Sequence, residues 1–262
     1  HKNEVVSPYY YSVLLDKYQI RAELTATARV GFHRYTYPAG KPSYVLIDLH
    51  EGTSDAAYSC YARKVDDYTI EGYRYDHGWS PDRKVYFVLK SNTKIEKSTL
   101  FDDNTPTDRL QLKGKSVKCI LDFGQASQVL LKVALSSVSI DNAMENMQAE
   151  LPGWNFEQTK ESAMSEWNSQ LGKVKVQALN DRDRRIFYTS FYHTMIDPSL
   201  YCDVNGQYRG MDDMIYTDPS KSNYTTMSLW DTYRAWNPMM TLIQPEMVPH
   251  LVNSMLSIYR QQ

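Results

Sequence analysis

Residues 129–143, with the sequence VLLKVALSSVSIDNA, contain the point at which the chain changes its pattern. The first half, Val129–Leu135, is an almost continuous aliphatic run of the kind that forms a buried strand. The second half opens a helical pattern at Ser139-Ile140-Asp141 that continues to Glu150, and Asp141 is its predicted N-cap. This stretch therefore predicts strands on its N-terminal side and helices on its C-terminal side.

On the N-terminal side, short strand-like runs follow one another without a long helix between them. Residues 20–27 and 30–37 alternate as expected for a sheet with one solvated face. The run 44–49 is more continuously apolar, and we expect it to be a buried central strand. The other predicted strands are 9–15, 69–73, 85–89, 116–121 and 129–135. This succession predicts an antiparallel β-sandwich, which we assign to residues 1–138.

On the C-terminal side, the spacing of apolar residues predicts helices. Residues 139–175 are predicted to form linker helices between two domains. Another helix is expected from Asp181, which would cap it, until Asp197-Pro198 stops it. Ile186 and Phe191 belong to its predicted packing face, and residues 176–262 are predicted to begin a helical domain.

Both ends of the sequence have the features expected of a piece of a longer protein. The chain starts at His1, without an initiator methionine or a signal peptide. The last helical pattern places Met247, Leu251, Met255 and Ile258 on one face and reaches Gln262 without a stop signal. We therefore expect a truncated chain.

The overall composition excludes several classes of protein. With 42% hydrophobic and 23% charged residues, the sequence is typical of a folded globular protein. A net charge of -2 without a dense basic run argues against nucleic acid as a partner. No apolar run approaches the length of a transmembrane helix. Cys60, Cys119 and Cys202 are predicted to be buried thiols, with a single disulfide as the alternative.

The aromatic residues are unusual, because 21 Tyr and 5 Trp accompany only 7 Phe. Tyrosine and tryptophan combine an apolar ring with a polar group, which suits the stacking and hydrogen bonding of sugars. The alternative is a β-rich fold whose strands use tyrosine on their exposed faces. Composition alone leaves both interpretations open.

One candidate binding segment is Tyr201–Asp213, with the sequence YCDVNGQYRGMDD. Asn205-Gly206 is a strong hairpin signal, so Asp203 and Arg209 are expected to face each other across a small β-ribbon. Carboxylates and an arginine on such a loop suit a polyhydroxylated ligand. The alternative is a solvated hairpin with a surface ion pair.

A second candidate is Ser228–Pro238, with the sequence SLWDTYRAWNP. Trp230 can stack on a sugar ring while the Asp231 carboxylate accepts hydrogen bonds from two hydroxyls. Arg234 is three residues after Asp231, and a helix would bring the two side chains together as an ion pair. In the alternative interpretation, Trp230 is a core residue and Asp231 caps the helix.

Several motifs together resemble family 92 of the glycoside hydrolases, which are calcium-dependent exo-α-mannosidases. The resemblance extends over nearly the whole chain. The motifs that carry it are ELTATARVGFHRY at 23–35, FYTSFYHT at 187–194, YRGMD at 208–212 and SLWDTYR at 228–234. One departure from the family pattern is Trp236-Asn237, where the resemblance implies a smaller residue and a histidine. It bears on the detail of the neighbouring subsite and not on the family.

The resemblance implies a β-sandwich, linker helices and the first helices of an (α/α)6 barrel. It implies hydrolysis of terminal α-linked mannose from glycans with inversion, assisted by calcium, in a secreted, periplasmic or cell-surface bacterial protein. The predicted substrate-binding residues are Trp230, Asp231, Arg234, Asp203 and Arg209. In the family the general acid, the base and most calcium ligands come from later in the barrel. We therefore predict no catalytic residue and no metal ligand within residues 1–262.

Two alternative functions remain open from the sequence. One is a non-catalytic carbohydrate-binding module, because the chain is rich in Tyr and Trp and offers no acid/base pair. The other is a different inverting glycosidase or phosphorylase with the same two-domain architecture.

Overall fold

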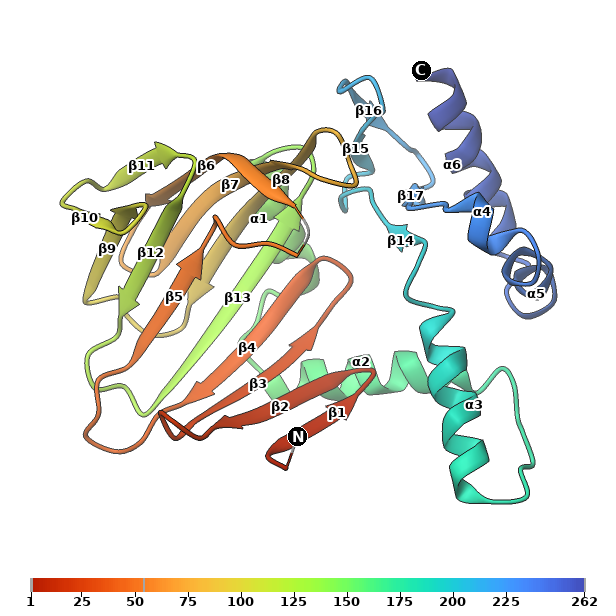
Figure 1. Ribbon diagram of the computed structural model, residues 1–262, viewed down its shortest axis with the longest axis horizontal. Helices are drawn as coiled ribbons and strands as arrows, with labels where there is room; N and C mark the ends of the chain where they lie inside the picture. Colours follow the sequence, from red (N-terminus) through yellow and green to blue (C-terminus); the bar gives the residue numbers. More distant parts are fainter. Residues whose placement is uncertain (1, 54, 262) are drawn as a thin grey trace. The chain divides into compact units, whose positions relative to one another are not determined.

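The computed structural model describes residues 2–53 and 55–261 of the chain. The chain forms two compact units, His1–Lys160 and Glu161–Gln262, each of which is described by itself. The first unit consists mainly of strands and the second mainly of helices (Figure 1).

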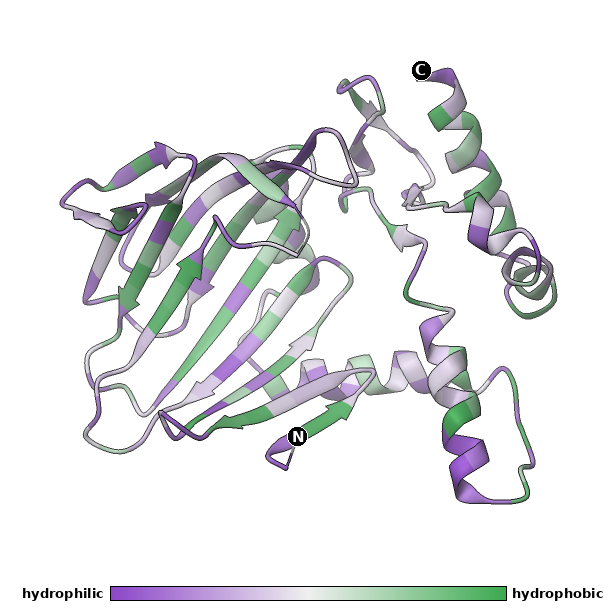
Figure 2. Cartoon of the chain, in the orientation of Figure 1, coloured by the Kyte–Doolittle hydropathy of each residue, from purple (hydrophilic) through white to green (hydrophobic). Residues whose placement is uncertain are grey.

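The largest element of the first unit is an antiparallel sheet of nine strands in the order β1-β2-β3-β4-β13-β8-β7-β6-β11. Alternating hydrophobic and hydrophilic residues can be followed along these strands in Figure 2. The bounds are β1 Glu4–Ser7, β2 Tyr10–Leu15, β3 Ile20–Ala26, β4 Val30–Thr36, β6 Ala56–Lys64, β7 Thr69–His77, β8 Arg83–Ser91, β11 Gln111–Gly114 and β13 Gln128–Ser136.

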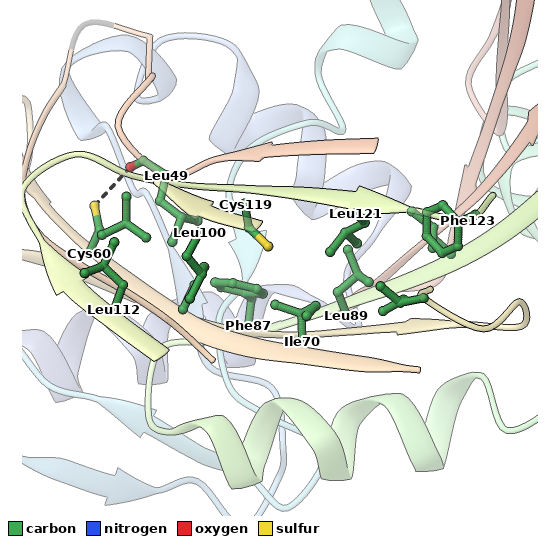
Figure 3. Close-up of a cluster of buried hydrophobic side chains, with 14 of the residues drawn as sticks. Leu49, Cys60, Ile70, Phe87, Leu89, Leu100, Leu112, Cys119, Leu121 and Phe123 are labelled. Carbon is green, nitrogen blue, oxygen red and sulfur yellow. Dashed lines mark hydrogen bonds between the residues drawn. The ribbon is translucent and has the colours of Figure 1, made fainter. Parts of the chain in front are cut away.

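A second antiparallel sheet has the order β10-β9-β12-β5. Its strands are β5 Tyr44–Asp48, β9 Lys97–Asp102, β10 Thr105–Thr107 and β12 Val117–Asp122. A continuous hydrophobic core contains side chains of both sheets, among them Ile70, Phe87 and Leu121 (Figure 3). Burial of this apolar surface on both sheets is the main stabilising contribution to the sandwich. The predicted β-sandwich is thus confirmed.

The position of β5 differs from the prediction. It pairs only with β12 and lies at an edge of the smaller sheet, so it is not a buried central strand. Its apolar run divides between two faces: Val45 and Ile47 pack on the core, whereas Tyr44 and Leu46 are 50% and 58% exposed. The prediction of a central strand was wrong because it relied on the continuous apolar run. Hydrophobic residues on both faces are typical of central strands, but here one face of an edge strand is exposed.

Helix α1, Ile140–Glu150, packs on the outer face of the large sheet, mainly on β13 and β8. Ser139 is its N-cap, because the Ser139 Oγ accepts a hydrogen bond from the Asn142 amide at 3.0 Å. Asp141, the predicted cap, lies instead within the first turn. A second buried cluster, which includes Phe32, Val88, Ala143 and Met147, joins this helix to the sheet.

Helix α2, Phe156–Leu171, begins on the same outer face. Arg34 of β4 binds Glu23 of β3 through two hydrogen bonds of 2.7 and 2.6 Å and Glu157 of α2 through one of 2.8 Å. The Arg34 guanidinium also lies 4.2 Å from the centre of the Phe156 ring. Hydrogen bonds from Arg34 hold the pKa of Glu23 below its usual value. A partly buried ion-pair network therefore fixes the start of α2 to the sandwich.

Lys132 is a buried cation in the middle of β13 and is 3% exposed. Its Nζ donates hydrogen bonds to the carbonyl oxygens of Leu151 at 2.8 Å and Pro152 at 3.3 Å, and lies 4.0 Å from the Trp154 ring centre. Burial lowers the pKa of Lys132 to about 8. This side chain ties the turn between α1 and α2 to the sheet.

The second unit contains four further helices, and the predicted change from strands to helices is confirmed. They are α3 Asp181–His193, α4 Leu229–Thr232, α5 Trp236–Ile243 and α6 Val248–Arg260. Asn180, and not Asp181, caps α3, because the Asn180 Oδ1 accepts a hydrogen bond from the Asp183 amide. Phe191 of the predicted packing face is buried, whereas Ile186 is 54% exposed.

Cys60, Cys119 and Cys202 are buried free thiols, as predicted. Burial raises the pKa of the Cys119 thiol to about 12, which keeps it in its unreactive protonated form. Across residues 2–53 and 55–261, no helix is long and apolar enough to span a bilayer.

Candidate functional site

Trp230 and Asp231 lie on the one-turn helix α4. Trp230 is 88% exposed, so it is not a core residue. Ser228 occupies the N-cap position without a side-chain cap hydrogen bond, so Asp231 does not cap the helix either. The Ser228 hydroxyl donates instead to Asp231 Oδ2 at 2.5 Å. The alternative interpretation, in which Trp230 is a core residue and Asp231 caps the helix, is therefore not observed.

The expected ion pair between Asp231 and Arg234 does not form within the described part of the chain. Helix α4 ends at Thr232, so Arg234 is not on the same helical face as Asp231. Arg234 lies against Tyr233, with its Nη2 3.2 Å from the Tyr233 hydroxyl and its guanidinium 5.7 Å from the ring centre. Residues three apart face each other only within a continuous helix, and the prediction assumed that the helix continues through Arg234.

The segment around Asp203 and Arg209 forms the predicted turn, and Arg209 also takes part in a ladder with a later strand. The Gly206 amide donates to the Asp203 carbonyl and the Asp203 amide to the Gln207 carbonyl, both at 2.8 Å. Gly206 has a φ of 87°, which favours glycine.

Arg209 pairs along a different ladder. Strand β15, Gln207–Arg209, pairs with β16, Ile215–Thr217, so that Arg209 lies opposite Ile215. The Arg209 Nη1 contacts the Asp213 carboxylate at 3.0 Å, whereas Asp203 is only 2% exposed. The hairpin that carries Arg209 thus closes after this residue and not at Asn205-Gly206.

A pocket of about 440 Å³ lies within the second unit and was not predicted from the sequence. The second half of α2, the segment after α3, helix α5 and the start of α6 supply its walls. Trp167, Tyr224 and Trp236 are its aromatic residues, and Met195, Met240 and Met247 add thioethers. The Trp236 Nε1 donates to the Thr194 carbonyl at 2.6 Å, which fixes the indole in the wall. Trp236 is the first residue of the predicted departure from the family pattern.

The acidic residues of the pocket are Glu166, Asp197 and Glu246, and His250 is its single histidine. Glu246 pairs with Lys173 at 2.9 Å, which lowers the pKa of the carboxyl group. Glu166 and Asp197 accept hydrogen bonds only from neutral groups in the described structure, the Gln170 amide at 3.2 Å and the Ser199 hydroxyl at 3.1 Å. The pocket therefore combines aromatic walls with two carboxylates that no cation neutralises.

Between residues 2 and 261, apart from residue 54, no group of three or more His, Cys, Asp or Glu side chains is arranged to hold a metal ion. Because calcium takes six to eight oxygen ligands, these residues do not fit it by themselves.

Part of the tyrosine content has a structural explanation. Tyr61, Tyr73, Tyr75 and Tyr86 lie on β6, β7 and β8 and are half-buried against one another. The rings of Tyr73 and Tyr75 stack with centres 4.2 Å apart, and the Tyr75 and Tyr86 hydroxyls are 2.6 Å apart. These tyrosine rings pack against one another across neighbouring strands. They therefore support, for this part of the sheet, the alternative in which the tyrosine content belongs to the faces of a β-rich fold.

Two sequence profiles match the chain. The "Glycosyl hydrolase family 92 N-terminal domain" matches residues 1–136, and the "Glycosyl hydrolase family 92 catalytic domain" matches residues 142–262.

Solved structures match over the whole chain. A family GH92 α-mannosidase from Bacteroides thetaiotaomicron, also solved in complex with mannoimidazole, has a TM-score of 0.94 at 35% identity, covering 100% of this chain and 36% of its own. A family GH92 inverting mannosidase from the VPI-5482 strain of this species has a TM-score of 0.89 at 23% identity, again over 100% and 36%, and supports the fold alone.

A curated protein described as an uncharacterized secreted glycosidase, from Arthroderma benhamiae, is 30% identical over 228 residues. The match covers 76% of this chain and 29% of that protein. The chain thus spans about a third of the length of the relatives that it matches.

Proposed function

The chain belongs to glycosyl hydrolase family 92, and we propose that it is part of an exo-acting α-mannosidase that removes terminal α-linked mannose from glycans with inversion. The observation that carries this proposal is the fit to an α-mannosidase over the whole chain at 35% identity and a TM-score of 0.94. A profile match to the catalytic domain also argues against a non-catalytic binding module.

In this proposal, Trp230 and Asp231 contact the terminal mannose. The exposed Trp230 indole offers a flat apolar surface to a sugar ring. Asp231 Oδ2 is engaged by Ser228, whereas Oδ1 has no hydrogen-bond partner among the residues described, so it can accept from sugar hydroxyls. Because one oxygen is held by a hydroxyl, the carboxylate keeps a fixed direction and acts in binding.

Arg234 and Arg209 are retained as substrate contacts in the proposal, since their guanidinium groups can donate to hydroxyls. Asp203 is given a different role from the one predicted. At 2% exposure it is closed off from a ligand, so we assign it to the support of the turn that precedes Arg209.

The chemistry of inversion requires a general acid and a general base about 6.5–9.5 Å apart, with water between the base and the sugar. We assign neither group to residues 1–262 and propose that both come from the remaining length that the relatives possess. Calcium, when bound, would coordinate sugar hydroxyls, and we place its ligands there as well. The proposed domains are a sandwich at 1–138, linker helices at 139–175 and the first helices of an (α/α)6 barrel at 176–262.

We further propose that the protein is exported, to the periplasm, the cell surface or the medium, because a relative is described as secreted. Fractionation of the source cells, followed by detection of the protein with an antibody, tests this. Exclusive recovery with the cytosolic fraction would contradict it.

The decisive experiment substitutes Asp231 in the complete enzyme. Asp231→Ala removes the proposed acceptor, and we expect kcat/KM for an α-mannoside to fall about 100-fold, as when several kcal/mol of transition-state binding are lost. Released mannose is measured with calcium present. Asp181→Ala is the matched control, because Asp181 is an exposed aspartate of the same unit in a surface ion pair with Arg184. Near-normal turnover of Asp231→Ala, with the fold intact by circular dichroism, would refute the assignment.

A further inference from the structure

The pocket of about 440 Å³ in the second unit has a composition that the mannosidase proposal does not use. Its volume is within the range of small-molecule sites and is large enough for a monosaccharide. Trp230 and Asp231, the residues proposed to contact mannose, are not among its lining residues. The proposed mannose contact at Trp230 and Asp231 therefore does not explain what this pocket binds.

The walls offer aromatic surface in fixed positions. Trp236 is held by its hydrogen bond to the Thr194 carbonyl at 2.6 Å, and the Trp167 ring packs edge-on against Tyr192 with centres 5.0 Å apart. Because both indoles are anchored from outside the pocket, little side-chain freedom is lost when a ligand contacts them. Indole faces attract cations more strongly than other aromatic side chains do.

The carboxylates that line the pocket are Glu166, Asp197 and Glu246, and Glu246 is paired with Lys173. Glu166 and Asp197 have no cationic partner in the described structure, and none of the described lining residues is a lysine or an arginine. The carboxylates are also spread around the walls, since no three acidic or histidine side chains come close enough to hold a metal ion in residues 2–53 and 55–261. Dispersed negative charge beside aromatic rings favours an extended organic cation over a metal ion.

We propose that this pocket binds a small organic cation, a protonated or quaternary amine on a hydroxylated or apolar body. In this arrangement Trp167 and Trp236 contact the cationic group and the carbon skeleton beside it. Glu166 and Asp197 supply the counter-charge. Neutral hexoses lack the group that the two carboxylates attract, so they bind more weakly than the corresponding aminohexoses.

The test compares mannosamine with mannose by isothermal titration on the chain of residues 1–262, at a pH where the amine is protonated. These two sugars differ at one position in an amino group. We expect mannosamine to bind at least 10-fold more tightly than mannose, and tetramethylammonium, but not sodium at equal ionic strength, to displace it. Equal affinity for the two sugars, or no saturable binding of either amine, would overturn the proposal.

Matched variants locate the binding site. The double variant Glu166→Gln and Asp197→Asn removes the charge and keeps the shape, and we expect mannosamine affinity to fall at least 10-fold. Glu161→Gln is the control, because Glu161 is an exposed carboxylate on the same helix α2 outside the pocket. An equal loss in the control, or no loss in the double variant with unchanged circular dichroism, would refute the assignment.

A final measurement repeats the titration on the complete enzyme. Retained binding supports a ligand site, whereas binding that is lost in the complete enzyme means that the remaining chain covers the pocket and overturns the proposal. The binding readout needs no turnover. It can therefore fail while the mannosidase activity stands, and it can succeed in an enzyme inactivated at Asp231.

Discussion

The two compact units differ in how much of their apolar surface they bury. Both buried hydrophobic clusters belong to the first unit, where side chains from two sheets and α1 meet. In the described part of the second unit, the buried apolar side chains are limited to Phe191, Pro198, Cys202, Tyr208, Met240 and Leu251. Large apolar residues such as Leu242 and Tyr259 are 82% and 78% exposed there.

This difference separates a region that stabilises itself from one that depends on further contacts. A sandwich whose sheets cover each other's inner faces already buries the surface that drives folding. Helices with apolar residues on the exposed side need a partner surface, as expected for a chain that spans 36% of a solved relative. We therefore expect the sandwich to dominate the stability of residues 1–262, and the following substitutions test that expectation.

The largest expected effect comes from Phe32, which is fully buried between the sheet and the rings of Trp154 and Phe156. Phe32→Ala should lower the free energy of unfolding by about 4 kcal/mol, because it leaves a cavity in a packed core. Met240→Ala in the second unit should cost only about 2 kcal/mol. Urea denaturation followed by circular dichroism measures both. An equal or larger loss at Met240 would break the comparison.

The next effect concerns the attachment of α2 to the sandwich. Arg34→Ala should cost about 3 kcal/mol, because it leaves the Glu23 carboxylate buried without its partner. The folded-state pKa of Glu23 is lowered, so its stabilising contribution is present above pH 4.5 and is lost as the pH falls through the folded-state pKa. Stability measured between pH 6 and 3 should therefore fall less steeply in the variant. An unchanged acid dependence would show that this network does not stabilise the fold.

The smallest effect is a change in alkaline behaviour at Lys132. Its pKa is about 8 in the folded chain and 10.5 without the fold, so between these values the unfolded chain holds a proton that the folded chain has released. Stability contributed by this site therefore rises as the pH increases from 8 towards 10.5, by about 2 kcal/mol between pH 8 and pH 10. Lys132→Met should lose this rise relative to the natural chain, as thermal melts at pH 7 to 10 will measure. A parallel pH profile in the variant would contradict the expected titration.

The sequence predicted the sandwich because its strands keep a strict alternation, as in β3 and β4. It missed β6, β9 and β11, whose Ala, Ser, Lys and Gln residues carry little strand propensity and depend on their neighbours for pairing. The two helix caps were placed within two residues of the observed ones, Ser139 and Asn180. Such errors arise because several polar residues compete for one cap position.

The candidate site was less predictable than the fold. The exposure of Trp230 follows from its position on a one-turn helix, which no periodicity reveals. The pairing of Arg234 with Asp231 failed because the helix ended too early. The ladder of Arg209 with a later strand was not indicated by the hairpin signal at Asn205-Gly206. The pocket joins residues as far apart as Glu166 and His250, so only the tertiary packing could assemble it.

The contrast between Trp230 and Trp236 has an optical consequence. Trp230 is 88% exposed to water, whereas Trp236 is partly buried and bonded to a carbonyl oxygen. An indole in water emits at longer wavelength and is accessible to collisional quenchers. A partly shielded indole emits at shorter wavelength and is less accessible to them. The chain has five tryptophans. Variants that keep only Trp230 or only Trp236 would each carry a single fluorescent reporter, the first for the proposed sugar contact and the second for the cation pocket.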